Sequence, residues 1–168
     1  LQVAQERGDP GVATSGGVAY ELVAPDAVGH LPPPDPGDVF FDFEGDPLWV
    51  DEAGTWGLEY LFGVLEAPTA PGAEPVFRPF WAHDRAGERQ ALLDFLAYLR
   101  ERRAAHPGMH VYHYASYEKT ALLRLAGRYG VGEDEVDALL REGVLVDLYA
   151  TVRAALRVGQ RSYSLKKL

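Results

Sequence analysis

Two carboxylates lie within an aromatic run in the first half of the chain. The run reads VFFDFEGDP over residues 39–47 and contains Asp42 and Glu44 two positions apart. On a strand, side chains two apart leave the same face, so both acids share one face while Phe41 and Phe43 point to the other. Neighbouring carboxylates repel each other unless a proton or a cation lies between them, and hard divalent cations prefer oxygen ligands. The pattern predicts a metal site, although a half-exposed strand with its acids in water gives the same pattern.

Two further acids follow later predicted strands. Glu118 lies in the first turn of a predicted helix, just after the apolar stretch MHVYHY, and a helix N-terminus favours negative charge. Asp147 follows the apolar run VLV. Each acid alone has an ordinary explanation, because Glu118 fits a first-turn acid and Asp147 fits a helix N-cap. Taken in chain order, the acids can converge at one end of a sheet, where two metal ions can clamp the attacking and leaving oxygens of a phosphodiester.

The elements that must position these acids alternate in a recognisable order. Hydrophobic periodicity and turn residues predict strands over 38–45, 58–67, 75–83, 109–114 and 143–147, and helices over 87–103, 117–129, 133–141 and 148–157, with one more from Ser162. Three adjacent strands with short links predict an antiparallel meander, and the later strand–helix alternation predicts parallel crossovers. The predicted fold class is therefore α/β, with a ribonuclease H-like mixed sheet (three antiparallel strands, then parallel strands) flanked by helices.

Composition excludes several classes of protein. The 168 residues are 47% hydrophobic and 24% charged, which is ordinary for a globular domain. Because there is no cysteine, disulfides and thiolate metal sites are excluded. No apolar run reaches about 18 residues, so we expect no membrane span. The first residues do not form a signal peptide, and a cytoplasmic location is expected.

Charge is distributed unevenly along the chain. The net charge is −9, which argues against simple electrostatic binding of nucleic acid. Residues 1–99 contain 4 Lys and Arg against 17 Asp and Glu, whereas residues 100–168 contain 12 against 8. The basic second half can face phosphates while the acidic half binds cations, or both can simply be solvated surface.

Domain boundaries are indicated by composition. Residues 1–37 are rich in Gly, Pro and Ala and are predicted to be an N-terminal linker or docking segment. Residues 38–168 are predicted to be the folded domain. The chain opens without methionine and stops at SYSLKKL, where a helical pattern is starting, so we expect a domain that is truncated at its C-terminus.

Five stretches of the sequence, taken together, resemble a known family. GDVFFDFEGDP, GLEYLFG, HYASYEKTALLRL, VDLY and SYSLKKL are similar to the ribonuclease H-like (DEDD-type) exonuclease domain of bacterial RecB-family nucleases. The resemblance covers about residues 31–168. It implies a 3′–5′ exonuclease-like activity on DNA or RNA and an upstream RecB-type nuclease module in the full-length protein.

The resemblance also implies roles for particular residues. Asp42 and Glu44 match the first exonuclease motif, D-x-E, whose acids bind metal. HYASYE matches the second motif, N-x-x-x-(F/Y)-D, so Glu118 takes the place of the aspartate and His113 that of the asparagine. Both are departures from the family pattern. Asp147 matches a recurrent aspartate that lies near the four metal-binding acids without being one of them, and the third motif would lie beyond the last residue.

We therefore expect a nuclease that uses Mg²⁺ or Mn²⁺ in a two-metal mechanism, with Asp42, Glu44 and Glu118 as ligands and Asp147 as an auxiliary or orienting group. Nucleic-acid contacts are expected from His113, Tyr117, Lys119, Arg161 and Lys166. Ordinary packing or solvated surface is the alternative for these five. The alternative function is a non-catalytic ribonuclease H-like module that positions nucleic acid or a partner domain, which the acidic balance and the two motif departures favour.

Overall fold

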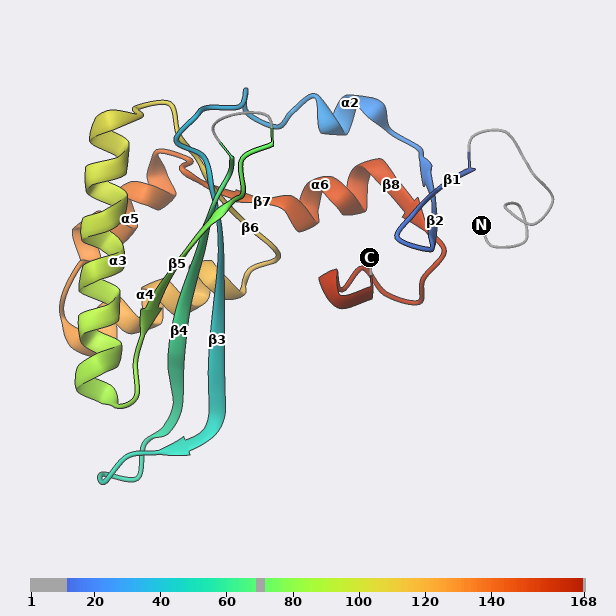
Figure 1. Cartoon of the computed structure of the whole chain (residues 1–168). Helices are drawn as coiled ribbons and strands as arrows, with labels where there is room; N and C mark the ends of the chain where they lie inside the picture. Colours follow the sequence, from blue (N-terminus) through green and yellow to red (C-terminus); the bar gives the residue numbers. More distant parts are fainter. Residues whose placement is uncertain (1–11, 69–71, 168) are drawn as a thin grey trace. The chain divides into compact units, whose positions relative to one another are not determined.

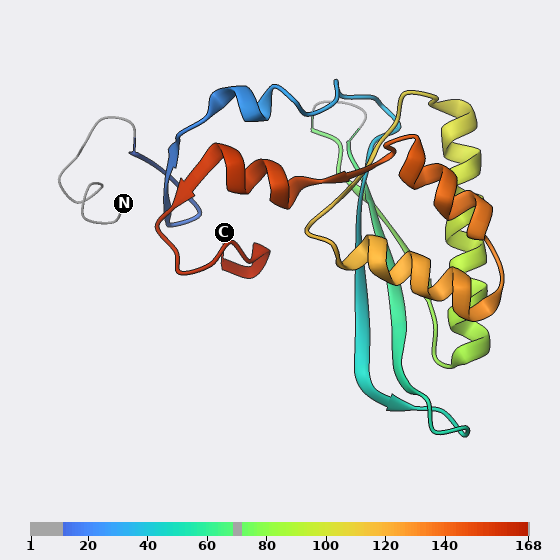
Figure 2. The ribbon, with the colours of Figure 1, turned by 180° about the vertical axis from the view of Figure 1, so that it is seen from behind.

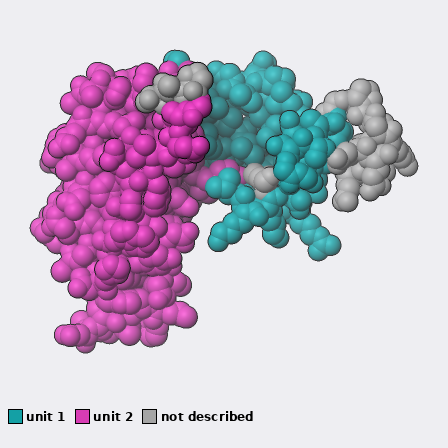
Figure 3. Space-filling view, in the orientation of Figure 1, with its two compact units in different colours: residues 1–33, 147–168 teal, residues 34–146 magenta. Residues whose placement is uncertain are grey.

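The computed structural model describes residues 12–68 and 72–167 and divides the chain into two compact units. Figure 3 colours the two units. We call residues Pro34–Val146 the sheet unit, and residues 1–33 together with 147–168 the terminal unit. None of the helices in the described ranges is long and apolar enough to cross a membrane.

The sheet unit is built on a five-stranded mixed sheet with the order β5-β4-β3-β6-β7 (Figure 1). Its strands are β3 (Val39–Val50), β4 (Trp56–Glu66), β5 (Val76–Trp81), β6 (Val111–His113) and β7 (Leu145–Asp147). The pairs β3–β4 and β4–β5 are antiparallel, whereas β3 and β6 are parallel. This topology confirms the predicted meander followed by a parallel crossover. It also places Pro79 on the edge strand β5, where proline leaves no ladder hydrogen bond unmade.

Three helices cover one face of this sheet, as both ribbon views show (Figures 1 and 2). They are α3 (Arg85–Ala105), α4 (Tyr117–Tyr129) and α5 (Glu133–Arg141). The core lies between the sheet and these helices, where Phe41 of β3 stacks on Phe95 of α3 with their ring centroids 4.4 Å apart. Asp84 is the N-cap of α3, because its carboxylate accepts a hydrogen bond from the Gly87 amide at 2.7 Å.

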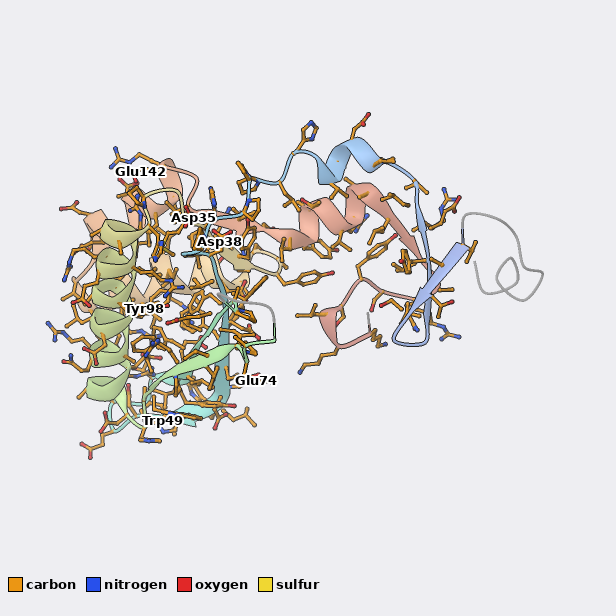
Figure 4. The ribbon with its side chains drawn as sticks, turned by 45° about the horizontal axis from the view of Figure 1, so that its top comes forward. Asp35, Asp38, Trp49, Glu74, Tyr98 and Glu142 are labelled. Atoms are coloured by element: carbon orange, nitrogen blue, oxygen red, sulfur yellow. The ribbon has the colours of Figure 1, made fainter. Side chains whose placement is uncertain are left out.

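Strand β3 is aligned at one end and irregular at the other. Before its first residue, Asp38 accepts a hydrogen bond from the His110 amide at 2.7 Å, which ties the start of β3 to β6. The strand was predicted to end near Gly45 but continues through Pro47 to Val50. The register shifts between Asp46 and Val50, so the missing amide hydrogen of Pro47 falls in a bulge. Asp38 and Trp49 mark the two ends of the strand in Figure 4.

The terminal unit contains a three-stranded antiparallel sheet of order β1-β2-β8. Its elements are β1 (Val12–Ser15), β2 (Val18–Leu22), α2 (Pro25–Val28), α6 (Leu148–Ala155), β8 (Leu156–Val158) and η1 (Leu165–Lys167). Part of the segment predicted to be a linker or docking segment, residues 1–37, thus forms strands β1 and β2. The helix predicted to reach residue 157 ends at Ala155, because the next three residues pair with β2 instead. The helix predicted from Ser162 was also wrong, since only a 3₁₀ turn forms there, with Lys167 bonded to the Ser164 carbonyl.

Candidate functional site

Strand β3 separates its aromatic residues from its acids. Phe41 and Phe43 are buried against the helices, whereas Phe40, Asp42 and Glu44 lie on the opposite face and are exposed. The alternation follows from the two-residue period of a strand. It confirms that Asp42 and Glu44 share one face, which is the face that α3, α4 and α5 leave uncovered.

Asp42 forms a carboxyl pair with Glu118. Glu118 is only 3% exposed and lies in the first turn of α4. Although the Asp42 residue is exposed, its carboxyl group is partly desolvated beside the buried Glu118. This desolvation, a hydrogen bond with Glu118 and the negative charges of Glu118 and Glu44 raise the pKa of Asp42 from 3.8 to about 6, and a backbone hydrogen bond at Phe43 opposes the shift. Two carboxyl groups can share a hydrogen bond only if one of them carries a proton. A divalent cation between the two carboxylates would relieve the same repulsion in place of the proton.

His113 lies beside this pair, at the end of β6. Its ring is 2% exposed, and Nδ1–H donates to the Ala115 carbonyl oxygen at 2.7 Å while lying 3.3 Å from Oε2 of Glu118. Ala115 has a φ of +72°, a left-handed conformation that costs energy for any residue with a Cβ. The tight turn between β6 and α4 therefore brings His113 and Glu118 together. Because the ring is buried, it faces Glu118 rather than solvent.

The remaining predicted site residues lie in different environments. Tyr117 is 51% exposed, and its hydroxyl donates to Oε1 of Glu59 at 2.7 Å. Lys119 follows Glu118 and is half-buried. Asp147 caps α6, because its carboxylate accepts from the Tyr149 amide at 2.9 Å. Arg161 and Lys166 are exposed and, like Asp147, belong to the terminal unit. The carboxyl pair belongs to the sheet unit. The predicted roles of Arg161, Lys166 and Asp147 at the site therefore stay predictions.

Two buried acids near α4 were missed by the sequence analysis. Glu59 of β4 is 4% exposed, and Glu88 of α3 is fully buried. Glu88 accepts hydrogen bonds from Arg85 at 3.2 Å, from Arg128 at 3.1 Å and from the Tyr129 hydroxyl. A signal for Glu88 was present, because it lies three, four and seven residues before the buried apolar positions of α3 and so shares their helix face. Glu59 gave no comparable signal.

Apolar side chains surround the acids on the uncovered face of the sheet. The strand register aligns Phe40 with Leu65 and Phe77, and Glu44 with Leu61 and Trp81. Gly63 lies opposite Asp42, and a Cβ added at Gly63 would meet the Phe77 ring at 3.3 Å. Exposed aromatic rings that do not belong to the buried core therefore border the acids.

The chemistry of the carboxyl pair fits a hard divalent cation. Within residues 12–68 and 72–167, no group of three or more His, Asp or Glu side chains is already arranged to hold a metal ion. Oε2 of Glu118 is buried and has no hydrogen-bond partner among the described residues. Because Mg²⁺ commonly takes one or two protein carboxylates and completes its shell with water and substrate phosphates, Asp42 and Glu118 provide enough protein ligands for one ion.

A mixed sheet with helices on one face and acids on its central strand defines an α/β protein of the ribonuclease H-like class. A family model described as RNase_H superfamily matches residues 39–168, which is well over half of the chain. The chain therefore belongs to the RNase H superfamily. No curated protein and no solved structure matches it. The match begins at the first residue of β3, while the predicted boundary at residues 37 and 38 and the DEDD-type and RecB-family assignments stay predictions.

Proposed function

We propose that this domain is a metal-dependent nuclease, 3′–5′ exonuclease-like, that hydrolyses phosphodiester bonds of DNA or RNA. The observation that carries the proposal is the contact between Asp42 and Glu118, which unites the acid of β3 with the acid of α4. Two carboxyl groups that share a hydrogen bond form a pair of oxygen donors that a divalent cation can occupy in place of the proton. Membership of the RNase H superfamily supports the same chemistry.

Each side chain of the site has a task in this proposal. Asp42 and Glu118 hold a Mg²⁺ or Mn²⁺ ion, which when bound activates water and stabilises charge on the phosphate. Glu44 lies on the same face and close enough to raise the pKa of Asp42, so it is the nearest further donor for a second ion. His113 lies beside Glu118, with Nδ1 at 3.3 Å from Oε2, while its Nδ1–H bonds the Ala115 carbonyl and fixes the turn that carries Glu118. Asp147 stays an auxiliary candidate, although capping α6 already explains an aspartate at the start of that helix.

The surroundings of the acids support a nucleic-acid substrate. Exposed Phe40, Phe77 and Trp81 share the face of Asp42 and Glu44, and aromatic rings of this kind stack on unpaired bases. Tyr117 and Lys119 flank Glu118 and can contact the bound nucleic acid. Arg161 and Lys166 provide positive charges for its phosphates. The upstream RecB-type module and the cytoplasmic location belong to this proposal as well.

A second candidate function is a non-catalytic module that positions nucleic acid or a partner domain. One observation favours it: the described residues contain no ready-made group of three metal-ligating side chains. A module of this kind needs the fold and the surface but not the carboxyl pair.

A nuclease assay separates the two candidates. End-labelled single-stranded DNA and RNA are incubated with Mg²⁺ or Mn²⁺ and the wild-type chain, Asp42→Asn or Glu101→Gln, which changes an exposed acid on α3. If the domain is a nuclease, the wild type and Glu101→Gln should shorten the labelled strands from their 3′ ends. Asp42→Asn should lower the cleavage rate at least about 100-fold. Binding without cleavage, equal in all three proteins, would decide for the positioning module.

A further inference from the structure

The carboxylate of Glu59 binds the first two turns of α4. It is buried in β4, and its Oε1 accepts a hydrogen bond from the Tyr117 hydroxyl at 2.7 Å and forms an ion pair with Arg124. Tyr117 is the first residue of α4 and directly precedes Glu118. Through these two contacts, one side chain of β4 attaches the start of α4 to the sheet.

Glu88 continues the same attachment along the helix. Tyr117, Arg124 and Arg128 are spaced seven and four residues apart, so they share one face of α4. Arg128 and the neighbouring Tyr129 both donate to Glu88, and the backbone amide of Glu59 donates to Oε1 of Glu88 at 2.6 Å. The two buried acids are thus linked to each other and together hold α4 from its first turn to its last.

The same Glu59 carboxylate also lies against the strand that carries the metal-binding acids. A Cβ added at Gly45 would be only 2.4 Å from Oε2 of Glu59, so any larger residue there would require the end of the Glu59 side chain to shift. Gly45 is paired with Glu59 in the sheet register and follows Glu44 directly. Glu59 therefore contacts both elements that meet at the site, β3 on one side and α4 on the other.

Stability alone explains this arrangement poorly. Buried ion pairs lose much of their attraction to desolvation, and well-packed apolar residues often serve stability as well or better. An ion pair does, however, fix the relative placement of the two elements it joins. Placement matters at a catalytic site, because displacements of about 1 Å can cost a factor of 100 in rate.

We infer that Glu59 is a positioning residue: by holding Tyr117 and Arg124, it keeps the first turn of α4 against β3 and thereby keeps Glu118 in contact with Asp42. The inference rests on the proposed function, because it assigns Glu59 to the metal site that Asp42 and Glu118 form. Glu59 touches neither substrate nor metal in this account and acts only through α4.

Strand β4 itself provides a matched control. Glu66, at the other end of β4, is also a largely buried acid, and it accepts hydrogen bonds from Tyr98 at 3.0 Å and from Arg78 and pairs with Arg102 at 3.2 Å. Tyr98 and Arg102 are on α3 and Arg78 is on β5, so these donors do not come from α4. Tyr98 is labelled in Figure 4. Glu66→Gln therefore removes a comparable ionic cluster without touching the helix that carries Glu118.

The test compares Mn²⁺ affinity by calorimetry in the wild type, Glu59→Gln, Glu66→Gln, Tyr117→Phe and the double variant Glu59→Gln with Tyr117→Phe. We expect Glu59→Gln to weaken Mn²⁺ binding by about 10- to 100-fold, the range found for residues that orient metal ligands, and Glu66→Gln to leave it unchanged. The double variant should lose less affinity than the two single losses combined, because both substitutions break the same contact. Equal affinities in Glu59→Gln and Glu66→Gln overturn the inference.

A second readout keeps the inference separate from the proposed function. Hydrogen exchange of the amides in residues 117–123 is measured on the metal-free proteins. We expect faster exchange there in Glu59→Gln and Tyr117→Phe but not in Glu66→Gln, and unchanged exchange in the first two overturns the inference. If the wild type binds no Mn²⁺ while the exchange pattern is as expected, the metal proposal fails and the attachment of α4 by Glu59 stands. Tyr117→Phe keeps the ring and serves in place of Glu59→Gln should that variant not fold.

Discussion

The carboxyl groups of Asp42 and Glu118 are hydrogen-bonded to each other, although the two residues lie 76 positions apart in the sequence. Asp42 belongs to the central strand β3, and Glu118 belongs to the first turn of α4. Two negative charges within hydrogen-bonding distance repel each other, so without metal the pair stays together only while one carboxyl group retains a proton. In the proposed function, a divalent cation replaces this proton and takes both carboxylates as ligands. This competition between a proton and a metal ion gives the pair measurable consequences.

Metal should stabilise the folded chain through this pair. Because a ligand that binds only the folded state adds RT ln(1 + [L]/Kd), Mn²⁺ at 100 times its Kd should add about 2.7 kcal/mol to the free energy of unfolding. Asp42→Asn should abolish the rise in melting temperature, and Glu101→Gln should keep it. A rise of equal size in Asp42→Asn would place the bound ion elsewhere.

Stability of the metal-free chain should fall as pH rises through the titration of Asp42. The pKa is raised from 3.8 to about 6 by burial and by Glu118 and Glu44, so the folded state binds this proton more tightly than the unfolded state does. The stabilisation is fully present below pH 3.8 and is lost as pH rises through about 6. Thermal unfolding of wild type and Asp42→Asn between pH 4 and pH 7.5 isolates this effect by difference. Parallel curves for the two proteins would contradict the raised pKa.

Ala115→Gly should stabilise the chain. The left-handed backbone of Ala115 costs about 1–2 kcal/mol, while glycine loses about 0.4–1 kcal/mol through the greater freedom of the unfolded chain, which leaves a net gain of up to about 1.6 kcal/mol. The control is Ala97→Gly within α3, where the same change should cost about 0.5–1 kcal/mol. Urea unfolding measures both. A loss of stability in both variants would mean that no strain at position 115 is relieved.

Glu88→Ala should be among the most destabilising single changes in the sheet unit. It leaves Arg85, Arg128 and Tyr129 without their shared buried acceptor, and breaking a buried pair in this way costs about 3–5 kcal/mol. Glu101→Ala on the exposed face of the same helix should change stability by no more than about 0.5 kcal/mol. Urea midpoints of the two variants within experimental error of each other would show that the buried cluster contributes little.

Local patterns predicted the parts of the fold that depend on local physics. The alternation of Phe41, Asp42 and Phe43 was sufficient to assign the two faces of β3, because a strand's two-residue period is independent of what packs on it. The helix that carries Glu118 was equally readable, since its apolar spacing and its end at Gly130, which adopts the left-handed φ of +59°, are both local.

Long-range pairing could not be predicted in the same way. The strand Leu156–Val158 follows a helix directly and forms because β2 is available as a partner more than 130 residues earlier. The Glu59–Tyr117 contact likewise joins residues 58 positions apart and has no mark in either local stretch. Glu59 can be buried because Tyr117 and Arg124, both on α4, donate hydrogen bonds to its carboxylate, and this requires the tertiary packing of α4 on β4.

The most direct test of the central claim is diffraction from crystals soaked in Mn²⁺ at pH 8, with anomalous density examined around the uncovered face of β3. We expect a peak within bonding distance of carboxylate oxygens of both Asp42 and Glu118, at about 2.0–2.3 Å as for other oxygen-bound divalent ions. An absent peak, with the two carboxyl groups still bonded to each other at millimolar Mn²⁺, would contradict it.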